Sequence, residues 1–441
     1  MMPIVAIVGR PNVGKSTLFN RLAGRRKAVV SDEPGATRDL NYAEIQEKDC
    51  SFTLVDTGGF MADAVDEISG EVKQQAGLAI EDADLTVFLM DCRSGPTPED
   101  VELLSMLRDS GKSVVYALNK VDSSRQEELV GEFYNRLGIK DVVLISAEHG
   151  RGINDLSDAI SARLPRQQAL NEGENGADKA VAIAIVGRPN AGKSTLLNRI
   201  VGRKRAITSS IAGTTRDPVD TAIELDGRRY VFVDTAGIRK KTRISNKTEI
   251  YCVIAAIKAI ERCDCALLVL NAIEGLAEQD EKIAGLIEGK FKCCIIVVNK
   301  WDAIEKDGNT AKFVEEEIRR RLPFLSFAPV LFVSALKGKR VSDITGLIDS
   351  IVEKSRQRFS TSELNKALEG ITRRSAPPSY RGKEVKFYYM TQTGVSPPEF
   401  LIFSNIPHGI KESYRRYMIK GLRDGLGLAS APIRVIFKKR S

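Results

Sequence analysis

Short apolar runs recur along the first 350 or so residues and alternate with longer amphipathic stretches. Runs that are apolar throughout are typical of strands buried on both faces of a sheet, and the stretches between them are typical of helices. The alternation predicts an α/β fold, a mostly parallel sheet with helices on both faces and ligands at the carboxyl ends of its strands. The runs are Ile4–Val8, Phe52–Val55, Leu85–Met90, Val114–Leu118, Val142–Ile145, Val181–Val186, Tyr230–Val233, Ala266–Leu270, Cys294–Val298 and Val330–Val333.

The second half of this pattern repeats the first. The offset is 178 residues between Lys15 and Lys193 and grows to 188 between Ser146 and Ser334. A period this long indicates two copies of a whole domain rather than a solenoid of short repeats.

After about residue 355 the pattern changes to helix, strand, strand, helix and strand, which predicts a small α+β domain. It carries 17 Lys and Arg against 6 Asp and Glu, a net charge of +11, whereas the whole chain has +8. The predicted elements are helices at Thr361–Arg374 and Lys411–Gly425, and strands at Glu384–Thr391, Glu399–Ser404 and Ile433–Lys439. The predicted domains are residues 1–165, 181–354 and 355–441, with a flexible polar linker at 166–180.

The basic domain has aromatic residues beside its charges. Exposed rings could stack on RNA bases while the cations bind phosphates, although a place in the core is expected for about half of the rings. The rings are Phe387, Tyr388, Tyr389, Tyr414 and Tyr417. No Gly-x-x-Gly clamp is present, so the domain could instead bind RNA by charge alone or dock on the other domains.

Each copy of the repeated domain begins with an apolar strand, a loop that fits G-x-x-x-x-G-K-[ST], and a helix-like run. In this context the glycines let backbone N–H groups surround phosphate oxygens, the lysine reaches the outer phosphates, and the serine can ligate magnesium. The sequence therefore predicts two phosphate-binding loops. Their residues are Gly9, Arg10, Pro11, Asn12, Val13, Gly14, Lys15, Ser16 and Thr17, and Gly187, Arg188, Pro189, Asn190, Ala191, Gly192, Lys193, Ser194 and Thr195.

An Asp-Thr-x-Gly sequence follows the next predicted strand in each copy. The aspartate would hold magnesium through a water, and the last glycine would sense the γ-phosphate. A threonine earlier in each copy, Thr37 or Thr215, could ligate magnesium while the γ-phosphate is present. The residues at and after the Asp-Thr-x-Gly turns are Asp56, Thr57, Gly58, Gly59 and Phe60, and Asp234, Thr235, Ala236, Gly237 and Ile238.

Asn-Lys-x-Asp closes a later strand in each copy, and Ser-Ala closes the last one. A carboxylate can accept two hydrogen bonds from the guanine ring N–H and exocyclic amine, a pair of donors that adenine lacks, so these residues predict GTP rather than ATP. The Ser-Ala pairs would supply a backbone N–H near the guanine oxygen. The residues are Asn119, Lys120, Val121, Asp122, Ser146 and Ala147, and Asn299, Lys300, Trp301, Asp302, Ser334 and Ala335.

This set of motifs, with two loops that read Gly-Arg-Pro-Asn-x-Gly-Lys-Ser and one basic terminal domain, resembles the Der/EngA family of bacterial ribosome-assembly GTPases. The resemblance covers essentially the whole chain. It implies two G domains and a KH-like terminal domain that act in assembly of the large ribosomal subunit.

Phe60 and Ile238 stand where many small GTPases have a glutamine that orients the attacking water, so that route is closed. Asn12 and Asn190 match the asparagine that helps coordinate a monovalent cation in potassium-dependent relatives. The resemblance thus implies potassium activation; the alternative is that each asparagine only stabilises its loop. In the catalytic steps we expect Lys15, Lys193, Asn12, Asn190, Thr37, Thr215, Gly59 and Gly237 to take part.

No apolar run approaches the roughly 18 to 20 residues that span a bilayer. The first predicted strand starts so early that we expect no signal sequence, and we expect a cytoplasmic monomer with no membrane or DNA partner. The seven cysteines lie mostly in or beside apolar runs and form no C-x-x-C pair, so we interpret them as buried thiols. Two readings remain open: a GTPase whose nucleotide-dependent domain arrangement controls its association with the large subunit, and an RNA-binding scaffold that hardly hydrolyses GTP.

Overall fold

The computed structural model describes residues 2–25, 42–47, 50–57, 77, 79–81, 83–122, 130–139, 141–164, 180–202, 207–208, 220–235, 249–305 and 307–440. The chain divides into two compact units, Met1–Gly176 with Asn246–Ala255, and Ala177–Ser245 with Ala256–Ser441. The predicted linker lies outside the described residues except for residue 180.

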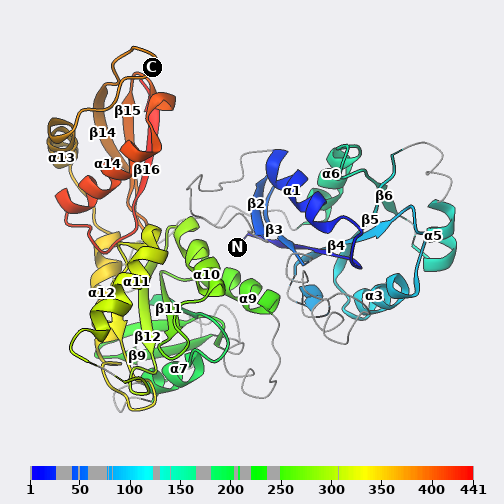
Figure 1. The fold of residues 1–441 in the computed structure, drawn as a ribbon, viewed down its shortest axis with the longest axis horizontal. Coiled ribbons are helices and arrows are strands. Elements are labelled where there is room, and N and C mark those ends of the chain that lie inside the picture. Colours follow the sequence, from blue (N-terminus) through cyan, green and yellow to red (C-terminus); the bar gives the residue numbers. More distant parts are fainter. Residues whose placement is uncertain are drawn as a thin grey trace. The chain divides into compact units, whose positions relative to one another are not determined.

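The first unit holds a six-stranded sheet in the order β2-β3-β1-β4-β5-β6 (Figure 1). All neighbouring strands are parallel except β2 and β3, so the predicted parallel sheet is confirmed. The elements of this unit are β1 (Ile4–Val8), α1 (Lys15–Arg25), β2 (Tyr42–Gln46), β3 (Ser51–Asp56), β4 (Leu85–Asp91), α3 (Pro98–Asp109), β5 (Ser113–Asn119), α5 (Val130–Leu137), β6 (Val142–Leu144) and α6 (Ile153–Arg163).

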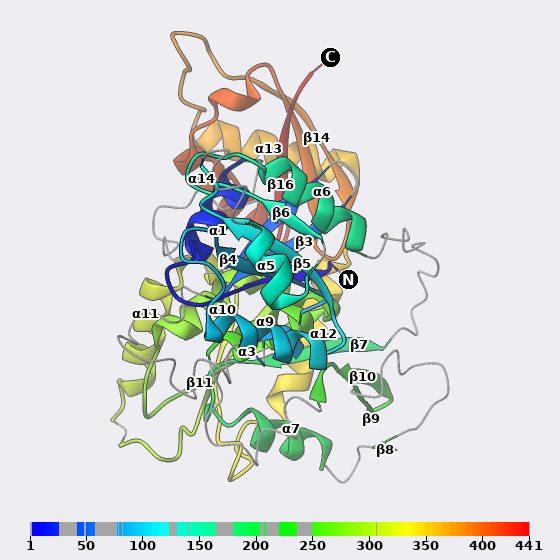
Figure 2. The same ribbon diagram turned by 90° about the vertical axis from the view of Figure 1, so that its right-hand side faces the viewer.

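The second unit repeats this sheet with one more short strand, in the order β13-β12-β11-β7-β10-β9-β8. Figure 2 shows β10 and β9 beside β7, at the antiparallel edge. The elements are β7 (Val181–Val186), α7 (Lys193–Val201), β8 (Ile207–Thr208), β9 (Thr221–Leu225), β10 (Arg228–Phe232), α9 (Glu249–Arg262), β11 (Cys265–Asn271), α10 (Glu278–Gly289), β12 (Cys293–Asn299), α11 (Thr310–Arg321), η2 (Pro323–Leu325), β13 (Val330–Phe332) and α12 (Asp343–Ser355). Residues 249–255 of α9 are grouped with the first unit and the rest of the helix with the second.

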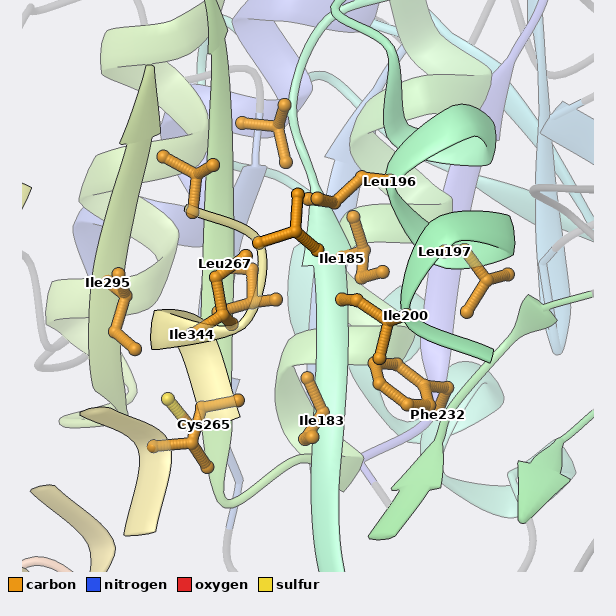
Figure 3. Close-up of a cluster of buried hydrophobic side chains, with 14 of the residues drawn as sticks. Ile183, Ile185, Leu196, Leu197, Ile200, Phe232, Cys265, Leu267, Ile295 and Ile344 are labelled. Carbon is orange, nitrogen blue, oxygen red and sulfur yellow. The ribbon is translucent and has the colours of Figure 1, made fainter. Parts of the chain in front are cut away.

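Helices cover both faces of the first sheet. Val5 and Ile7 of β1 pack in one cluster with residues of α1 and α6, whereas Ala6 and Val8 pack in another with residues of α3 and α5. Because successive side chains of a strand point to opposite faces, an apolar run without polar breaks is what such a strand requires. In the second sheet, Figure 3 shows isoleucines of β7 packed against leucines of α7 and against Ile344 of α12.

The C-terminal domain has a three-stranded sheet in the order β14-β15-β16. Its helices share one hydrophobic cluster with the sheet residues Met390, Phe400 and Ile402, so they cover the same face. The order of elements matches the predicted one. They are α13 (Thr361–Arg374), β14 (Phe387–Gly394), β15 (Glu399–Ser404), η3 (Pro407–Gly409), α14 (Glu412–Gly425) and β16 (Arg434–Lys439).

The structure divides the aromatic residues of this domain into two groups. Tyr414 is 6% exposed and its hydroxyl donates to the carbonyl of Ser375 at 2.6 Å, and Phe387 and Tyr417 pack against the same core. Tyr388 and Tyr389 are 44% and 39% exposed. Three of the five rings are therefore core residues, close to the expected half. Tyr388 and Tyr389 are adjacent on β14 and both exposed, where the pairing with β15 shifts register.

Contacts within the second unit join this domain to the preceding sheet domain. The N–H of Ser396 donates to the carbonyl of Ser355 at 2.9 Å. The Arg423 guanidinium lies 4.6 Å from the ring centre of Phe327, and burial lowers the pKa of Arg423 to about 10. None of the helices among the described residues has the length and apolar character needed to cross a membrane.

Candidate functional site

The two predicted phosphate loops have the same backbone shape. The φ angles of Asn12 and Gly14 are 62° and 97°, and those of Asn190 and Gly192 are 60° and 92°. This left-handed conformation favours glycine and, to a lesser degree, asparagine. A Cβ on Gly14 or Gly192 would also lie 2.4 or 2.2 Å from a neighbouring asparagine amide. The loops therefore need these residue types for their shape alone.

The lysine that follows each loop reaches back over it. Lys15 Nζ donates to the carbonyls of Gly9 at 2.9 Å and Arg10 at 2.8 Å, and Lys193 makes the same two contacts in the second copy. Burial lowers the pKa of Lys15 to about 8, while the charge of Asp56 raises it and that of Arg10 lowers it further. The ammonium group is thus held against the carbonyls of the first two loop residues in each domain.

Arg10 and Arg188, which the sequence analysis included only as loop residues, anchor the loops to a helix. Arg188 Nε donates to Asp280 Oδ2 at 2.7 Å, and Arg10 Nε lies 3.5 Å from Asp100 Oδ2. Both aspartates are 0% exposed. Moving the arginine away would leave a buried aspartate charge uncompensated, which is energetically costly. The ion pairs therefore hold the phosphate loops in place against these helices. Asp100 and Asp280 are 180 residues apart, and the sequence repeat could have identified them.

The Asp-Thr turns lie next to the phosphate loops because β3 pairs with β1 and β10 pairs with β7. Asp56 is opposite Ile7 in the register and is 2% exposed. Asp234 has a φ of 55°, and its N–H donates to Asp220 Oδ1 at 3.1 Å. The other residues predicted for the γ-phosphate region lie outside the described residues: Thr37, Gly58, Gly59, Phe60, Thr215, Ala236, Gly237 and Ile238.

The two carboxylates predicted to bind guanine are hydrogen-bonded by serines of the Ser-Ala pairs. Ser146 Oγ donates to Asp122 Oδ1 at 2.7 Å. Hydrogen bonds from Ser146 and Arg93 lower the pKa of Asp122, and a hydrogen bond from Ser334 lowers that of Asp302. Both groups are therefore anionic near neutral pH and can accept hydrogen bonds from neutral donors.

A buried asparagine ties three of the predicted motifs together in each domain. Asn119 Nδ2 donates to the carbonyl of Val13 at 2.8 Å, and Asn119 Oδ1 accepts from the N–H of Ala147 at 2.9 Å. Asn299 makes the same pair of bonds, to Ala191 at 2.9 Å and from Ala335 at 3.0 Å. The asparagine thus connects the phosphate loop to the Ser-Ala turn.

The helix after each phosphate loop adds a second connection that the sequence analysis missed. Arg21 Nε donates to the carbonyl of Ala147 at 2.9 Å, and Arg199 Nε donates to that of Ala335 at 3.0 Å. In the first domain Lys120 Nζ also donates to the carbonyl of Asn12 at 2.8 Å. Motifs that are more than 100 residues apart in the sequence therefore form one site in each domain.

A family model described as a 50S ribosome-binding GTPase matches residues 4–120 and again 182–300. A second, described as the KH-domain-like C-terminal part of EngA bacterial GTPase enzymes, matches residues 358–438. The chain is 47% identical to the GTPase Der of Geotalea daltonii over 440 residues, which covers 100% of this chain and 99% of that protein. For the GTPase Der of Moorella thermoacetica the identity is 46% over 437 residues, covering 99% and 98%.

Among solved structures, the FeoB G-domain from Methanococcus jannaschii is 29% identical. The match covers 37% of this chain and 98% of that domain, with a TM-score of 0.27.

Proposed function

The chain belongs to the GTPase Der family, and from this premise we propose that its two G domains hydrolyse GTP to control association with the large ribosomal subunit in the cytoplasm. We further propose that it works as a monomer. Its domains in this proposal are residues 1–165, 181–354 and 355–441, with 166–180 as linker. The observation that carries the proposal is the buried asparagine connection, because it is the same in both domains and links phosphate-binding and guanine-binding residues.

In each domain the backbone of the phosphate loop and its lysine would bind the phosphates, and Asp122 or Asp302 would bind the guanine edge. Phosphoryl transfer requires mainly positioning and compensation of the developing charge. Lys15 and Lys193 supply a cation that the loop itself holds in place. A water would attack the γ-phosphate in line, and loss of contact at Thr37, Thr215, Gly59 and Gly237 would change the domain arrangement.

Magnesium is implied by the family, and the donor set suits it. Ser16 and Ser194 are the second residues of α1 and α7, and the hydroxyl and carboxylate oxygens of Ser16 and Asp56 are the hard ligands that Mg²⁺ prefers. The charge of Asp56 raises the pKa of Lys15, so the two groups are close together. The proposed metal ligand therefore lies beside the proposed phosphate site. When bound, Mg²⁺ would neutralise phosphate charge. The proposed ligands are Ser16, Thr37 and Asp56, and Ser194, Thr215 and Asp234, with the aspartates acting through water.

We propose potassium as a further cofactor, held near Asn12 and Asn190. Both residues are exposed, and neither side-chain amide makes a hydrogen bond with any residue in the described part of the chain. The alternative reading, an amide that ties its own loop together, thus lacks a contact to support it. The left-handed backbone still gives each asparagine a structural reason to be there, so a rate measurement must decide.

GTP hydrolysis is expected to be several-fold faster in potassium than in sodium at matched ionic strength. Alanine at Asn12 should remove the part of this stimulation that belongs to the first domain, and alanine at Asn190 the part that belongs to the second. Steady-state phosphate release in the two salts measures this. Asn20→Ala, on the exposed side of α1, serves as the control. Equal rates in both salts, or stimulation that survives both changes, would rule potassium out.

The open face of the C-terminal sheet is the surface we propose for ribosomal RNA. Tyr389, Phe403 and Lys438 are neighbours in register across the three strands, and they alternate with buried residues that face the helices. The rings of Tyr389 and Phe403 are stacked, with centres 4.3 Å apart. Exposed aromatic rings beside cations are typical of surfaces that stack on unpaired bases and bind phosphates.

Gly421 and Gly425, four residues apart on α14, do not form a nucleotide clamp. A Cβ on Gly421 would lie 2.9 Å from Ile371 of α13, so this glycine permits close packing of the two helices. The sheet face therefore offers the better surface for RNA within this domain.

Large ribosomal subunits should bind the protein more tightly with a non-hydrolysable GTP analogue than with GDP. Tyr389→Ala is expected to weaken this binding about tenfold, because one stacked base contributes about 1–3 kcal/mol. Lys438→Ala should lower the slope of log affinity against log salt by about 0.7, as expected for one lost phosphate contact on a single strand. Co-sedimentation at several salt concentrations measures both.

Tyr389→Phe and Lys420→Ala are the matched controls, since the first keeps the ring and the second removes an exposed charge from the helical side. Equal binding in the two nucleotide states would contradict the proposed control by GTP. Unchanged binding of the Tyr389 and Lys438 variants would move the RNA contact to another surface.

A further inference from the structure

The two guanine-binding carboxylates each face a cation, but the cations come from different loops. In the first domain, Arg93 Nη2 lies 2.5 Å from Asp122 Oδ2, and Arg93 is two residues beyond the end of β4. In the second domain, Lys337 Nζ lies 3.5 Å from Asp302 Oδ2, and Lys337 is three residues beyond Ser334.

Aligning the two copies of the repeat shows which residue each domain has at the positions of Arg93 and Lys337. The residue at the position of Arg93 in the second copy is Ile273, which is 58% exposed and cannot form an ion pair. The residue at the position of Lys337 in the first copy is His149, whose Nε2 lies 3.8 Å from Asp122 Oδ1. The second domain thus has no arginine two residues after β11, and the cation beside its carboxylate is Lys337 on the loop after Ser334.

We propose that this cation is a positioning residue for guanine binding, supplied by Arg93 in the first G domain and by Lys337 in the second. The inference rests on the proposed role of Asp122 and Asp302 in reading guanine. It assigns to these two side chains the task of holding the carboxylate charged and oriented toward the base.

The hydrogen-bonding capacity of the carboxylate shows that such a cation need not block the base. An ionised carboxylate has about four acceptor positions, two on each oxygen. Ser146 occupies one position on Oδ1 of Asp122, and Arg93 occupies one on Oδ2. These two donors together take two of the about four positions, so Arg93 by itself does not fill the oxygen that it contacts. A bound guanine base covers the carboxylate and excludes water from it but carries no charge of its own. The cation therefore compensates the negative charge of the carboxylate when the base is bound.

Other charged groups surround the two carboxylates. Near Asp122, Asp91 on β4 is paired with Lys120 at 2.6 Å, and the loop after β6 carries Glu148 and His149. Near Asp302, Asn271 replaces the aspartate of β4 and donates to Glu274. With Asn271 there, no carboxylate lies within ion-pair distance of Lys300 among the described residues, which is a further difference between the copies.

The test replaces each cation by the residue that the other domain has at the same position. In full-length protein whose second site is disabled by Lys193→Ala, Arg93→Ile is expected to weaken Mg-GDP binding about two- to fivefold, the range for a partly exposed ion pair. His149→Lys in the same chain should restore the affinity, because it recreates the arrangement of the second domain. In the Lys15→Ala background, Lys337→His should weaken binding and Ile273→Arg should restore it.

The pH profile separates positioning from a merely structural effect. The Ser146 and Arg93 hydrogen bonds lower the pKa of Asp122, and guanine needs the ionised form, so affinity falls as the pH drops through that pKa. Without Arg93 the pKa rises, and the acid limb of the GDP affinity curve should move to higher pH. Calorimetric titration from about pH 6 down to about pH 3, a range that includes the ordinary aspartate pKa of 3.8 and values below it, measures this, with melting temperatures alongside.

Tighter GDP binding after Arg93→Ile would overturn the inference, because the arginine would then block the carboxylate from the guanine base. An unmoved acid limb, or a loss that His149→Lys does not restore and that comes with a lower melting temperature, would also overturn it. Asp122→Ala tests the premise separately. If GDP binding survives that change, the guanine role itself fails; if it is lost while Arg93→Ile has no effect, only the inference fails.

Discussion

Alanine at Lys15 and at Lys193 is expected to remove GTP turnover from the domain that carries the change, by about 10²- to 10³-fold in rate. Each ammonium group is held by two loop carbonyls and is the cation that the fold presents to the phosphates. The single variants assign activity to each domain, and the double variant should be inactive. Single-turnover phosphate release measures this, with Lys312→Ala as the control because that side chain is 75% exposed on α11.

Turnover that persists in the double variant would contradict the assignment of both sites. Lys→Arg variants sharpen the test. They keep the positive charge, but a planar guanidinium cannot occupy the place that the ammonium group takes between two carbonyls. We therefore expect Arg substitutions to be nearly as damaging as alanine, whereas rescue by arginine would mean that charge alone is sufficient.

The same lysine gives the first domain a pH dependence at its alkaline side. Burial lowers the pKa of Lys15 to about 8 in the unliganded protein. Nucleotide phosphates favour the charged form and so raise this pKa on binding, which means that binding takes up a proton above about pH 8. GDP affinity of the first domain should be level below that pH and fall above it, by up to about tenfold per pH unit. Titration calorimetry at pH 9 in two buffers of different ionisation enthalpy measures the proton uptake directly.

Asn119→Ala and Asn299→Ala are expected to destabilise their own domain and to lose nucleotide binding. Each change leaves a buried carbonyl in the phosphate loop and a buried N–H in the Ser-Ala turn without a partner. An unpaired buried group costs about 1–3 kcal/mol, so for two such groups we expect a loss of about 2–6 kcal/mol in the free energy of unfolding. Urea denaturation with and without Mg-GDP measures both effects.

Asn20→Ala and Asn198→Ala are matched controls, since both residues are exposed and stand at the same place in α1 and α7. They should change the free energy of unfolding by less than about 0.5 kcal/mol. Asn119→Asp separates the two bonds, because a carboxylate can still accept from Ala147 but cannot donate to Val13. Full stability in the alanine variants would show that the connection is not needed to form the site.

The apolar runs and the glycine-rich motifs were readable from the sequence because they depend on local requirements. A strand buried on both faces needs an unbroken apolar run, as in β1, β4 and β11. A left-handed loop next to a helix N-terminus needs glycine or asparagine, as at Asn12 and Gly14. Strand β2 was missed because its residues alternate between buried and half-buried, so it has no apolar run.

The repeat, the α/β fold and the residues that bear the chemistry could be predicted from the sequence, because they depend on spacing along one strand–loop–helix unit. The distant side chains that support these residues could not be predicted, because they meet them only in the folded protein. Arg21 meets the turn at Ala147, 126 residues away, and Asp100 meets Arg10. The same holds for the choice of Arg93 or Lys337 beside the guanine carboxylate. These contacts join separate strand ends at one edge of the sheet, and no local propensity records which charges meet there once the chain has folded.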